Sequence, residues 1–509
     1  MKTKKEESGQ RGKGILLSYL QTVLHLIASL LYVPILLRVI GKNEYGVYQL
    51  AGSVIAYLSI MESFLSAGVQ RFYCKYKSLD DQEMMENTLA ISKRIYWFLS
   101  FIIVIIGTAV ISIVHYVYQN SLNTKELLET ELIIAVLVGN IVINLINYVY
   151  YAAIKANERF VFLNTASVLV EVLQPVCVIL LILKFPYALS VVVAHVIVNF
   201  VLCLVRRYYC LHILKVKIIY HSKDSALVKQ LITFSSGVLL AVLADQIFWK
   251  ADQLILGKLY GTGVVAVYAV GAQIYNNYSP IGTSISSVYM PKVSELYNRG
   301  RNMEEISNLF VKTGRIAFIL SSLVLTGFCI YGNKFVQMWA GKEYSDAYYV
   351  AVIVMTPFTI DVIQNFGLIV LQVENKYSFR GKMYFGIALI NLISTWFLAK
   401  KWGMIGAALA TGISMFIGNG LIMNWYYSHR AGLNIELFWK EILKIIPAIG
   451  LSTLGGICLR KIFPVINWFT FIVNVIGYIV IYVLVLYFIA FNNYEKELTR
   501  KMLMRLKKS

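Results

Sequence analysis

The chain has 509 residues, of which 58% are hydrophobic and only 15% are charged. Soluble domains typically contain about 25% charged residues, so this chain has too few charged side chains to cover a surface that faces water. The composition excludes a soluble enzyme, a disordered protein and a soluble nucleic-acid binder, although the formal net charge is +20.

Apolar runs long enough to cross a bilayer, about 20 residues each, follow one another along the chain. After a polar, basic tail at 1–13, the first run extends from 14 to 40 and is too long for a signal peptide. Further runs lie at 46–68, 95–117, 131–153, 163–183, 187–205, 230–257, 262–290, 313–332, 346–372, 383–399, 403–427, 441–459 and 466–490. The sequence predicts an all-α, polytopic membrane protein with about 14 transmembrane helices.

The basic residues are distributed unequally between the two sides of this predicted topology. The termini and the connections on their side contain 35 lysines and arginines, the other side contains 11, and Lys250 lies inside a span. Because basic residues concentrate in cytoplasmic loops, both termini are predicted to be cytoplasmic. The positive charge therefore reports topology, and no nucleic-acid partner is expected.

A weak internal repeat relates the two halves of the chain. Gly41-Lys42 is repeated as Gly257-Lys258, and Tyr48 is repeated as Tyr268 at a nearly equal offset along the chain. Parallel repeats of this kind are a transporter architecture, so we expect two six-helix lobes followed by two C-terminal helices.

The expected boundaries follow the predicted spans. They are a cytoplasmic tail at 1–13, an N-lobe at 14–209, a cytoplasmic connection at 210–229, a C-lobe at 230–427, two helices at 440–490 and a cytoplasmic tail at 491–509.

In five predicted spans, polar side chains recur at separations that place each set on one helix face. Because polar groups are costly in a bilayer, such faces line a lumen or meet another helix. The sets are Ser18, Gln21, His25, Ser29 and Tyr32; Ser59, Glu62, Ser63 and Ser66; Asn140, Asn144, Asn147 and Tyr151; Asn164, Ser167, Glu171 and Gln174; and Gln273, Asn276, Pro280, Ser284 and Ser287. The two C-terminal spans show no such set, so a polar lumen is predicted within the first twelve helices.

The densest polar stretch lies at residues 244–253 of the seventh span. At about 100° per residue, Asp245 and Asp252 share one face, and Gln246, Lys250 and Gln253 form an adjacent row. Two interpretations remain open. Lys250 pairs with an aspartate to hold two helices together, or it binds an anionic substrate while the aspartates bind a coupling ion.

Five other ionisable residues lie within or near the spans, and each has a functional and a structural interpretation. His25 is able to titrate near neutral pH or to make a packing hydrogen bond, and Arg38 is able to extend to the interface. The carboxylates of Glu62, Glu171 and Asp361 would bind a proton or a sodium ion, or would hold neighbouring helices together.

Several kinds of chemistry have no motif in this sequence. There is no G-x-x-x-x-G-K-[ST] nucleotide-binding loop and no H-E-x-x-H metal site, and the six cysteines lack a metal-like or disulfide-framework spacing. We expect a transporter that moves a solute without transforming it, with neither a cofactor nor a metal.

The segment from Tyr32 to Tyr48, with Pro34, Arg38 and the run Gly41-Lys42-Asn43-Glu44-Tyr45-Gly46, resembles the opening signature of the polysaccharide flippases. These belong to the multidrug/oligosaccharidyl-lipid/polysaccharide exporter superfamily. The second half contains a similar pattern at 250–257, 267–269 and 291–292.

The resemblance implies a bacterial plasma-membrane flippase that alternates between inward- and outward-open states. It implies two six-helix lobes around a central cavity that is lined chiefly by helices 1, 2, 7 and 8. Its substrate would be an undecaprenyl-diphosphate-linked oligosaccharide for capsule, O-antigen or exopolysaccharide, and its partners would be membrane lipids, a proton or sodium ion, and polysaccharide polymerase and chain-length proteins. With the polar faces, it gives a substrate-binding set of Lys250, Arg38, His25, Gln246, Gln253 and Asn276 and an ion-coupling set of Asp245, Asp252, Glu62, Glu171 and Asp361.

Two other functions are compatible with parts of this pattern. A multidrug or cation antiporter of the same superfamily would normally lack the two C-terminal helices and the signature between Arg38 and Tyr48. A membrane-embedded polysaccharide polymerase would need a large outer loop, and the predicted outer connections are short.

Overall fold

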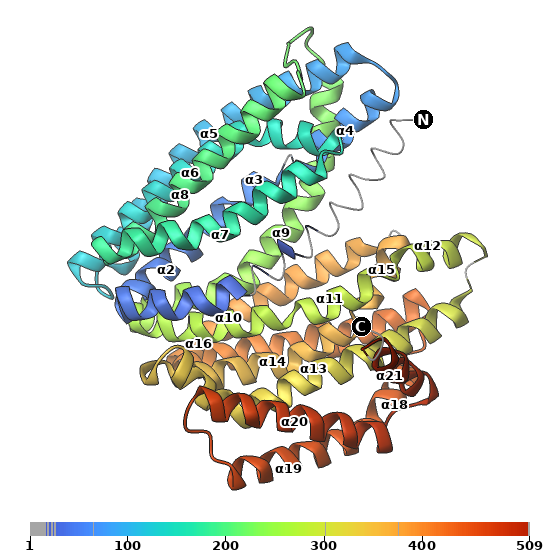
Figure 1. Cartoon of the computed structure of the whole chain (residues 1–509). Coiled ribbons are helices and arrows are strands. Elements are labelled where there is room, and N and C mark those ends of the chain that lie inside the picture. The colour runs from blue at the N-terminus through green and yellow to red at the C-terminus, as the bar shows by residue number, and fades with distance from the viewer. Residues whose placement is uncertain are drawn as a thin grey trace. The chain divides into compact units, whose positions relative to one another are not determined.

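The computed structural model describes residues 17, 20, 21, 24, 27–64, 66–300, 302–374 and 376–506. These residues form helices and contain no strand (Figure 1). An all-helical chain suits a bilayer because each helix satisfies its own backbone hydrogen bonds. The helical structure of the described residues confirms the predicted all-α class. The chain divides into two compact units, residues 1–266 and 267–509.

Unit 1 is a bundle in which α9 packs against α2, α3, α4 and α5, while α6 packs against α5 and α8. The apolar helical stretch Ile27–Ile40 precedes them among the described residues. The helices are α2 (Lys42–Leu58), α3 (Ile60–Phe64), α4 (Ser66–Ser78), α5 (Gln82–Tyr118), α6 (Thr124–Ala156), α7 (Phe160–Lys184), α8 (Ala188–Tyr208), the π-turn η1 (Tyr209–Ile213) and α9 (Ser225–Tyr260).

Unit 2 is a second bundle, in which α13 packs against α14, α18, α19 and α20. Its first helix, α10, begins at the end of unit 1. The helices are α10 (Thr262–Tyr278), α11 (Pro280–Ser287), α12 (Met290–Asn298), α13 (Met303–Trp339), η2 (Lys342–Tyr344), α14 (Ala347–Ile363), α15 (Asn365–Val373), α16 (Tyr377–Met415), η3 (Phe416–Ile422), α17 (Met423–Tyr426), η4 (Tyr427–Ala431), α18 (Ile435–Leu443), α19 (Ile446–Ile462), α20 (Trp468–Ile489) and α21 (Asn493–Leu506).

Eight helical segments of the described chain are long and apolar enough to span a membrane, or nine if the bent pair α14–α15 is one span. The 53-residue segment Phe379–Ala431 contains two predicted spans, which a non-helical turn at Trp402 and Gly403 divides. The helices at the first, second, seventh and eighth predicted spans are not among the eight. The second and eighth spans are interrupted, and α9, at the seventh span, contains the buried Asp252. A count of fourteen spans therefore stays a prediction.

The second and eighth predicted spans have the same local structure. α2 and α10 each contain 17 residues, and each follows a glycine at positive φ, Gly41 at 83° and Gly261 at 78°. Glycine suits these positions because it lacks the Cβ that disfavours positive φ. Ser59 follows α2 and Ser279 follows α10, and each serine precedes a short helix.

The long helices α5 and α13 repeat in the same way. Each has 37 residues, and the side chain of its N-cap, Asp81 or Asn302, accepts a hydrogen bond from a backbone N–H three residues later. The offset from Asp81 to Asn302 agrees with the offset from Gly41 to Gly261 to within one position. The register is therefore corrected, because Gly41 corresponds to Gly261 and not to Gly257.

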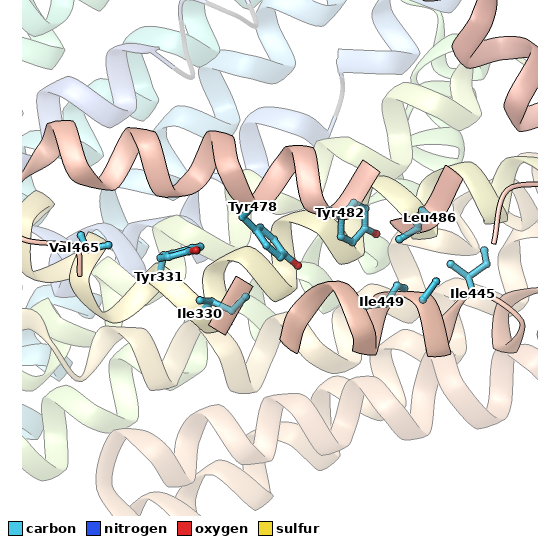
Figure 2. Packing of buried hydrophobic residues seen from close by; sticks show 9 residues of the cluster. Ile330, Tyr331, Ile445, Ile449, Val465, Tyr478, Tyr482 and Leu486 are labelled. Atoms are coloured by element: carbon cyan, nitrogen blue, oxygen red, sulfur yellow. The ribbon is translucent and has the colours of Figure 1, made fainter. Parts of the chain in front are cut away.

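The C-terminal helices α19 and α20 pack on α13 through a cluster of buried apolar and tyrosine side chains (Figure 2). Along α20, Asn474, Tyr478 and Tyr482 are buried on one face at steps of four. The hydroxyl of Tyr478 lies 2.6 Å from that of Thr326, and the hydroxyl of Tyr482 lies 2.7 Å from that of Ser322. The expectation that the last two spans lack a polar face was wrong, because tyrosine provides the polar atoms.

A buried arginine joins α13 to α18 and α21. Arg315 is 3% exposed, and its guanidinium donates to both carboxylate oxygens of Glu495, at 2.8 and 2.9 Å. It also donates to the carboxylate of Glu441 at 3.1 Å and to the carbonyl oxygen of Ala490 at 3.0 Å. Such a charge-assisted, two-pronged arrangement fixes geometry as well as adding energy.

Candidate functional site

The polar stretch predicted in the seventh span lies in the C-terminal half of α9, in unit 1. Its side chains differ in exposure. Asp245 is exposed, Gln246 and Lys250 are partly exposed, and Asp252 and Gln253 are each 2% exposed. The polar arc expected from helical geometry is therefore divided into an accessible part and a packed part.

The packed part meets α2. The hydroxyl of Ser53 donates a hydrogen bond to the side-chain oxygen of Gln253, and Asp252 lies within electrostatic range of Tyr57. Ser53 and Tyr57 are both on α2, so the packed part of the arc faces that helix, and Gln253 is hydrogen-bonded to it.

The accessible part contains Lys250, the cation that the sequence places inside a span. The carboxylate whose charge acts on it is that of Asp245, five residues earlier on α9. The side chain of Lys250 remains partly exposed. The charge of Asp245 favours the pairing interpretation within α9, and the partial exposure of the residue is compatible with ligand binding.

A hydrogen-bonded polar network joins α3, α6 and α8 within unit 1. The side-chain amide of Asn144 donates to the Glu62 carboxylate at 3.0 Å. The amide of Asn199 donates to the side-chain oxygens of Asn140 and Asn144, both at 2.7 Å. The predicted polar faces of the second and fourth spans therefore meet at Glu62, and helix α8 supplies the connecting amide.

A cation that sequence reasoning missed lies beside this network. Arg206 was counted with the cytoplasmic connection, but α8 continues to Tyr208, so Arg206 shares a helix face with Asn199. Its guanidinium lies 5.0 Å from the ring centroid of Tyr151, and the ring of Tyr148 lies 5.4 Å from that of Tyr151. The signal was available, because Arg206 lies two helical turns after Asn199.

The Nε atom of Arg206 is buried and has no hydrogen-bond partner within the described part of the chain. Buried polar atoms are normally satisfied, and an arginine provides a fork that matches phosphate or carboxylate oxygens. Together with the rings of Tyr148 and Tyr151, this side chain forms a cationic and aromatic surface suited to an anionic ligand with a sugar.

The other predicted residues of unit 1 are dispersed. Arg38 is exposed near the end of the Ile27–Ile40 helix, and Glu171 is partly exposed on α7. His25 lies outside the described residues.

In unit 2, Asn276 is exposed on α10. Asp361 of α14 lies 3.5 Å from the guanidinium of Arg380, which is a neighbour that the sequence analysis did not identify. Within the ranges that the structure describes, no three His, Cys, Asp or Glu side chains are placed to hold a metal ion.

Comparisons with known proteins give the family. Residues 35–349 match the family described as "Polysaccharide biosynthesis protein". The chain is 19% identical to a "Putative O-antigen transporter" of Shigella flexneri over 415 residues, covering 80% of this chain and 96% of that protein. It is also 25% identical to a "Probable flippase AglR" of Haloferax volcanii over 171 residues, covering 33% of this chain and 36% of that protein.

Solved structures share the fold at low sequence identity. "Lipid II flippase MurJ, inward closed conformation" gives a TM-score of 0.71 at 14% identity, covering 92% of this chain and 98% of that one. An inward-facing multidrug resistance MATE family transporter of the MOP superfamily gives 0.62 at 14% identity, covering 82% and 96%. The match over 35–349 shows that the chain belongs to the family described as "Polysaccharide biosynthesis protein", and the solved structures show that it shares its fold with a lipid II flippase and with MATE transporters.

Proposed function

We propose that the protein moves polyprenyl-diphosphate-linked oligosaccharides from the inner to the outer leaflet of a bacterial plasma membrane. It does so by alternating access of its two lobes, driven by a proton or sodium gradient. The observation that supports this most is Lys250, a partly exposed cation in the C-terminal half of α9, beside Asp245. Charge within a span is costly, and it marks a substrate or ion pathway.

Transport of this substrate requires polar groups within the membrane. A diphosphate and a glycan cannot cross about 30 Å of hydrocarbon, whereas the polyprenyl tail remains in lipid. The head group therefore needs a polar path. The interruptions after α2 and α10 provide irregular backbone of the kind that transporters place at binding sites.

Each polar group has a proposed role. Lys250 binds the diphosphate with Arg38, His25 and Arg206, and the rings of Tyr148 and Tyr151 stack on sugar. Gln246, Gln253 and Asn276 donate to hydroxyl groups, and Gln253 exchanges its hydrogen bond with Ser53 for one with the substrate. Glu62, Glu171, Asp245, Asp252 and Asp361 are the ion-coupling carboxylates, and Glu62 is tied through Asn144 and Asn199 to α8, which carries Arg206.

Replacing Arg206 by glutamine should lower the transport rate by about tenfold or more, because a hydrogen bond to a charged group contributes about 1.5–3 kcal/mol. Arg206→Lys should keep part of the activity, since it retains the charge but not the planar fork. The measurement is the initial rate in vesicles that contain equal amounts of each variant. Wild-type rates in Arg206→Gln would remove this residue from the proposed path.

The proposed orientation predicts cytoplasmic termini and an external connection around residues 120–123, between α5 and α6. A reporter fused after Ser509 should be active only in the cytoplasm, and a cysteine introduced at Asn120 should react with an impermeant thiol reagent from outside. The opposite labelling pattern would contradict the charge-based topology. Serine replacement of the six native cysteines supplies the background for this measurement.

The function is tested by removing the gene from its host and measuring lipid-linked oligosaccharide in each leaflet. We expect accumulation on the cytoplasmic side and loss of the surface polymer, with a polymerase and a chain-length protein acting after transport. Normal export, combined with increased sensitivity to cationic drugs, would favour an antiporter instead.

A further inference from the structure

A cavity of about 710 Å³, with basic residues among its lining, lies between α4 and the first turns of α9, both in unit 1. In Figure 1 these two segments lie at the same end of that unit. Among the described residues, its lining consists of Arg71, Phe72, Lys75, Lys229, Gln230 and Thr233. Three of the six lining side chains are cations, and none is a carboxylate.

The cations come from two helices that the fold brings together. α4 supplies Arg71 and Lys75, one turn apart and therefore on one face, and α9 supplies Lys229. All three are exposed. Helix contact between α4 and α9 places three like charges around one cavity, and an anion bound among them would lower their mutual repulsion.

Two charged residues near the cavity, Lys77 and Asp224, have hydrogen-bond partners outside its lining. Lys77, also on α4, points to the end of α6, where its ammonium lies 2.8 Å from the side-chain oxygen of Asn157. Asp224 caps α9 by accepting a hydrogen bond from the backbone N–H of Leu227 at 2.8 Å. Lys77, which contacts the end of α6, is therefore not one of the three cations that line the cavity.

We propose that this cavity is a docking site for the diphosphate of the lipid-linked saccharide at the cytoplasmic leaflet, before the head group enters the transport path. The site rests on the proposed function and the proposed orientation. It is separate from Lys250, which lies further along α9 than Lys229 does. The two residues are about six turns apart, which corresponds to roughly 30 Å along the helix axis.

A diphosphate fits this cavity better than a single phosphodiester does. Three cations match the multiple negative charges of a diphosphate, whereas a bulk phospholipid such as phosphatidylglycerol carries a single charge. The volume lies within the range of about 300–1,000 Å³ that is typical of small-ligand sites, and Gln230 and Thr233 add neutral hydrogen-bonding groups at its edge.

The test compares two variants of the full-length protein that lose the same charge. One combines Arg71→Gln, Lys75→Gln and Lys229→Gln. The control combines Lys215→Gln, Lys217→Gln and Lys223→Gln, which are exposed residues of the connection before α9 and are not among the lining residues. Binding of undecaprenyl diphosphate and of phosphatidylglycerol is measured by native mass spectrometry, and transport is measured in vesicles.

The cavity variant should bind undecaprenyl diphosphate at least about tenfold more weakly than the control variant does, with a slower transport rate at low substrate. A variant with Lys75→Arg and Lys229→Arg should bind like the wild type because it keeps the charges. Equal diphosphate binding by the cavity and control variants would overturn the docking site, as would an equal loss of phosphatidylglycerol binding. Failure of the wild type itself to transport would instead overturn the proposed function.

Discussion

Lys250→Ala is expected to abolish transport of lipid-linked saccharide while expression and membrane insertion stay near wild type. A central lysine costs about 2.5–3.5 kcal/mol on insertion scales, so its removal does not impair insertion. The loss arises because the diphosphate no longer meets a cation at this partly exposed position of α9. Lys250→Arg should retain part of the activity, since it preserves the charge with a different geometry.

The matched control is Lys184→Ala, an exposed lysine at the end of α7, which should transport normally. If Lys250 served only to pair with Asp245, Lys250→Ala would fold poorly, and adding Asp245→Asn would restore folding and transport. That outcome, or full transport by a normally expressed Lys250→Ala protein, would contradict head-group binding.

Arg315→Ala is expected to destabilise unit 2 by about 3–5 kcal/mol, the usual cost of removing one partner from a buried ion pair. Glu495, which Arg315 contacts with two hydrogen bonds, would remain buried and uncompensated. Because Glu441 is partly exposed, it would be solvated at less cost. The measurement is the thermal midpoint of the purified protein in detergent, with Lys334→Ala, an exposed lysine of the same helix α13, as the control.

Replacing both partners should cost less than removing one. Arg315→Met combined with Glu495→Met is expected to recover most of the lost stability, because no uncompensated charge is left in the packed region. Equal destabilisation by the single and double variants would mean that packing, rather than charge, accounts for the effect. The same contact predicts that a chain ending before α19 is destabilised, since it lacks Glu495 and the face of α20 that contains Tyr478.

The sequence was informative wherever a feature depends on local composition. Apolar runs are the signature of spans. The predicted runs coincide with the apolar central parts of α5, α6, α7, α8, α13 and α20. Composition does not show where a run is interrupted, so the break after α2 at Ser59 was not anticipated. Helix ends were also missed, and this is why Arg206 was assigned to a connection.

Features that depend on a tertiary neighbour were out of reach. Helical geometry identified a polar row at 246–253, but only packing against α2 separates Gln253, bound to Ser53, from the accessible Lys250. Tyr478 was counted with the apolar residues, although its hydroxyl contacts Thr326. The carboxylate of Glu62 was identified from its polar face, and its link to Asn144 required the fold.

The most direct test of the account uses purified protein in liposomes that contain a polyprenyl-diphosphate-linked oligosaccharide with a fluorophore on the sugar. A membrane-impermeant quencher added outside reports which leaflet holds the sugar. With a proton or sodium gradient imposed, the wild-type protein should move inner-leaflet sugar to the outer leaflet. With Lys250→Ala the sugar should stay in the inner leaflet, as it does in protein-free liposomes. Retention of the sugar in its original leaflet by the wild type, under either gradient, would contradict the proposal that this chain is a flippase for diphosphate-linked saccharides.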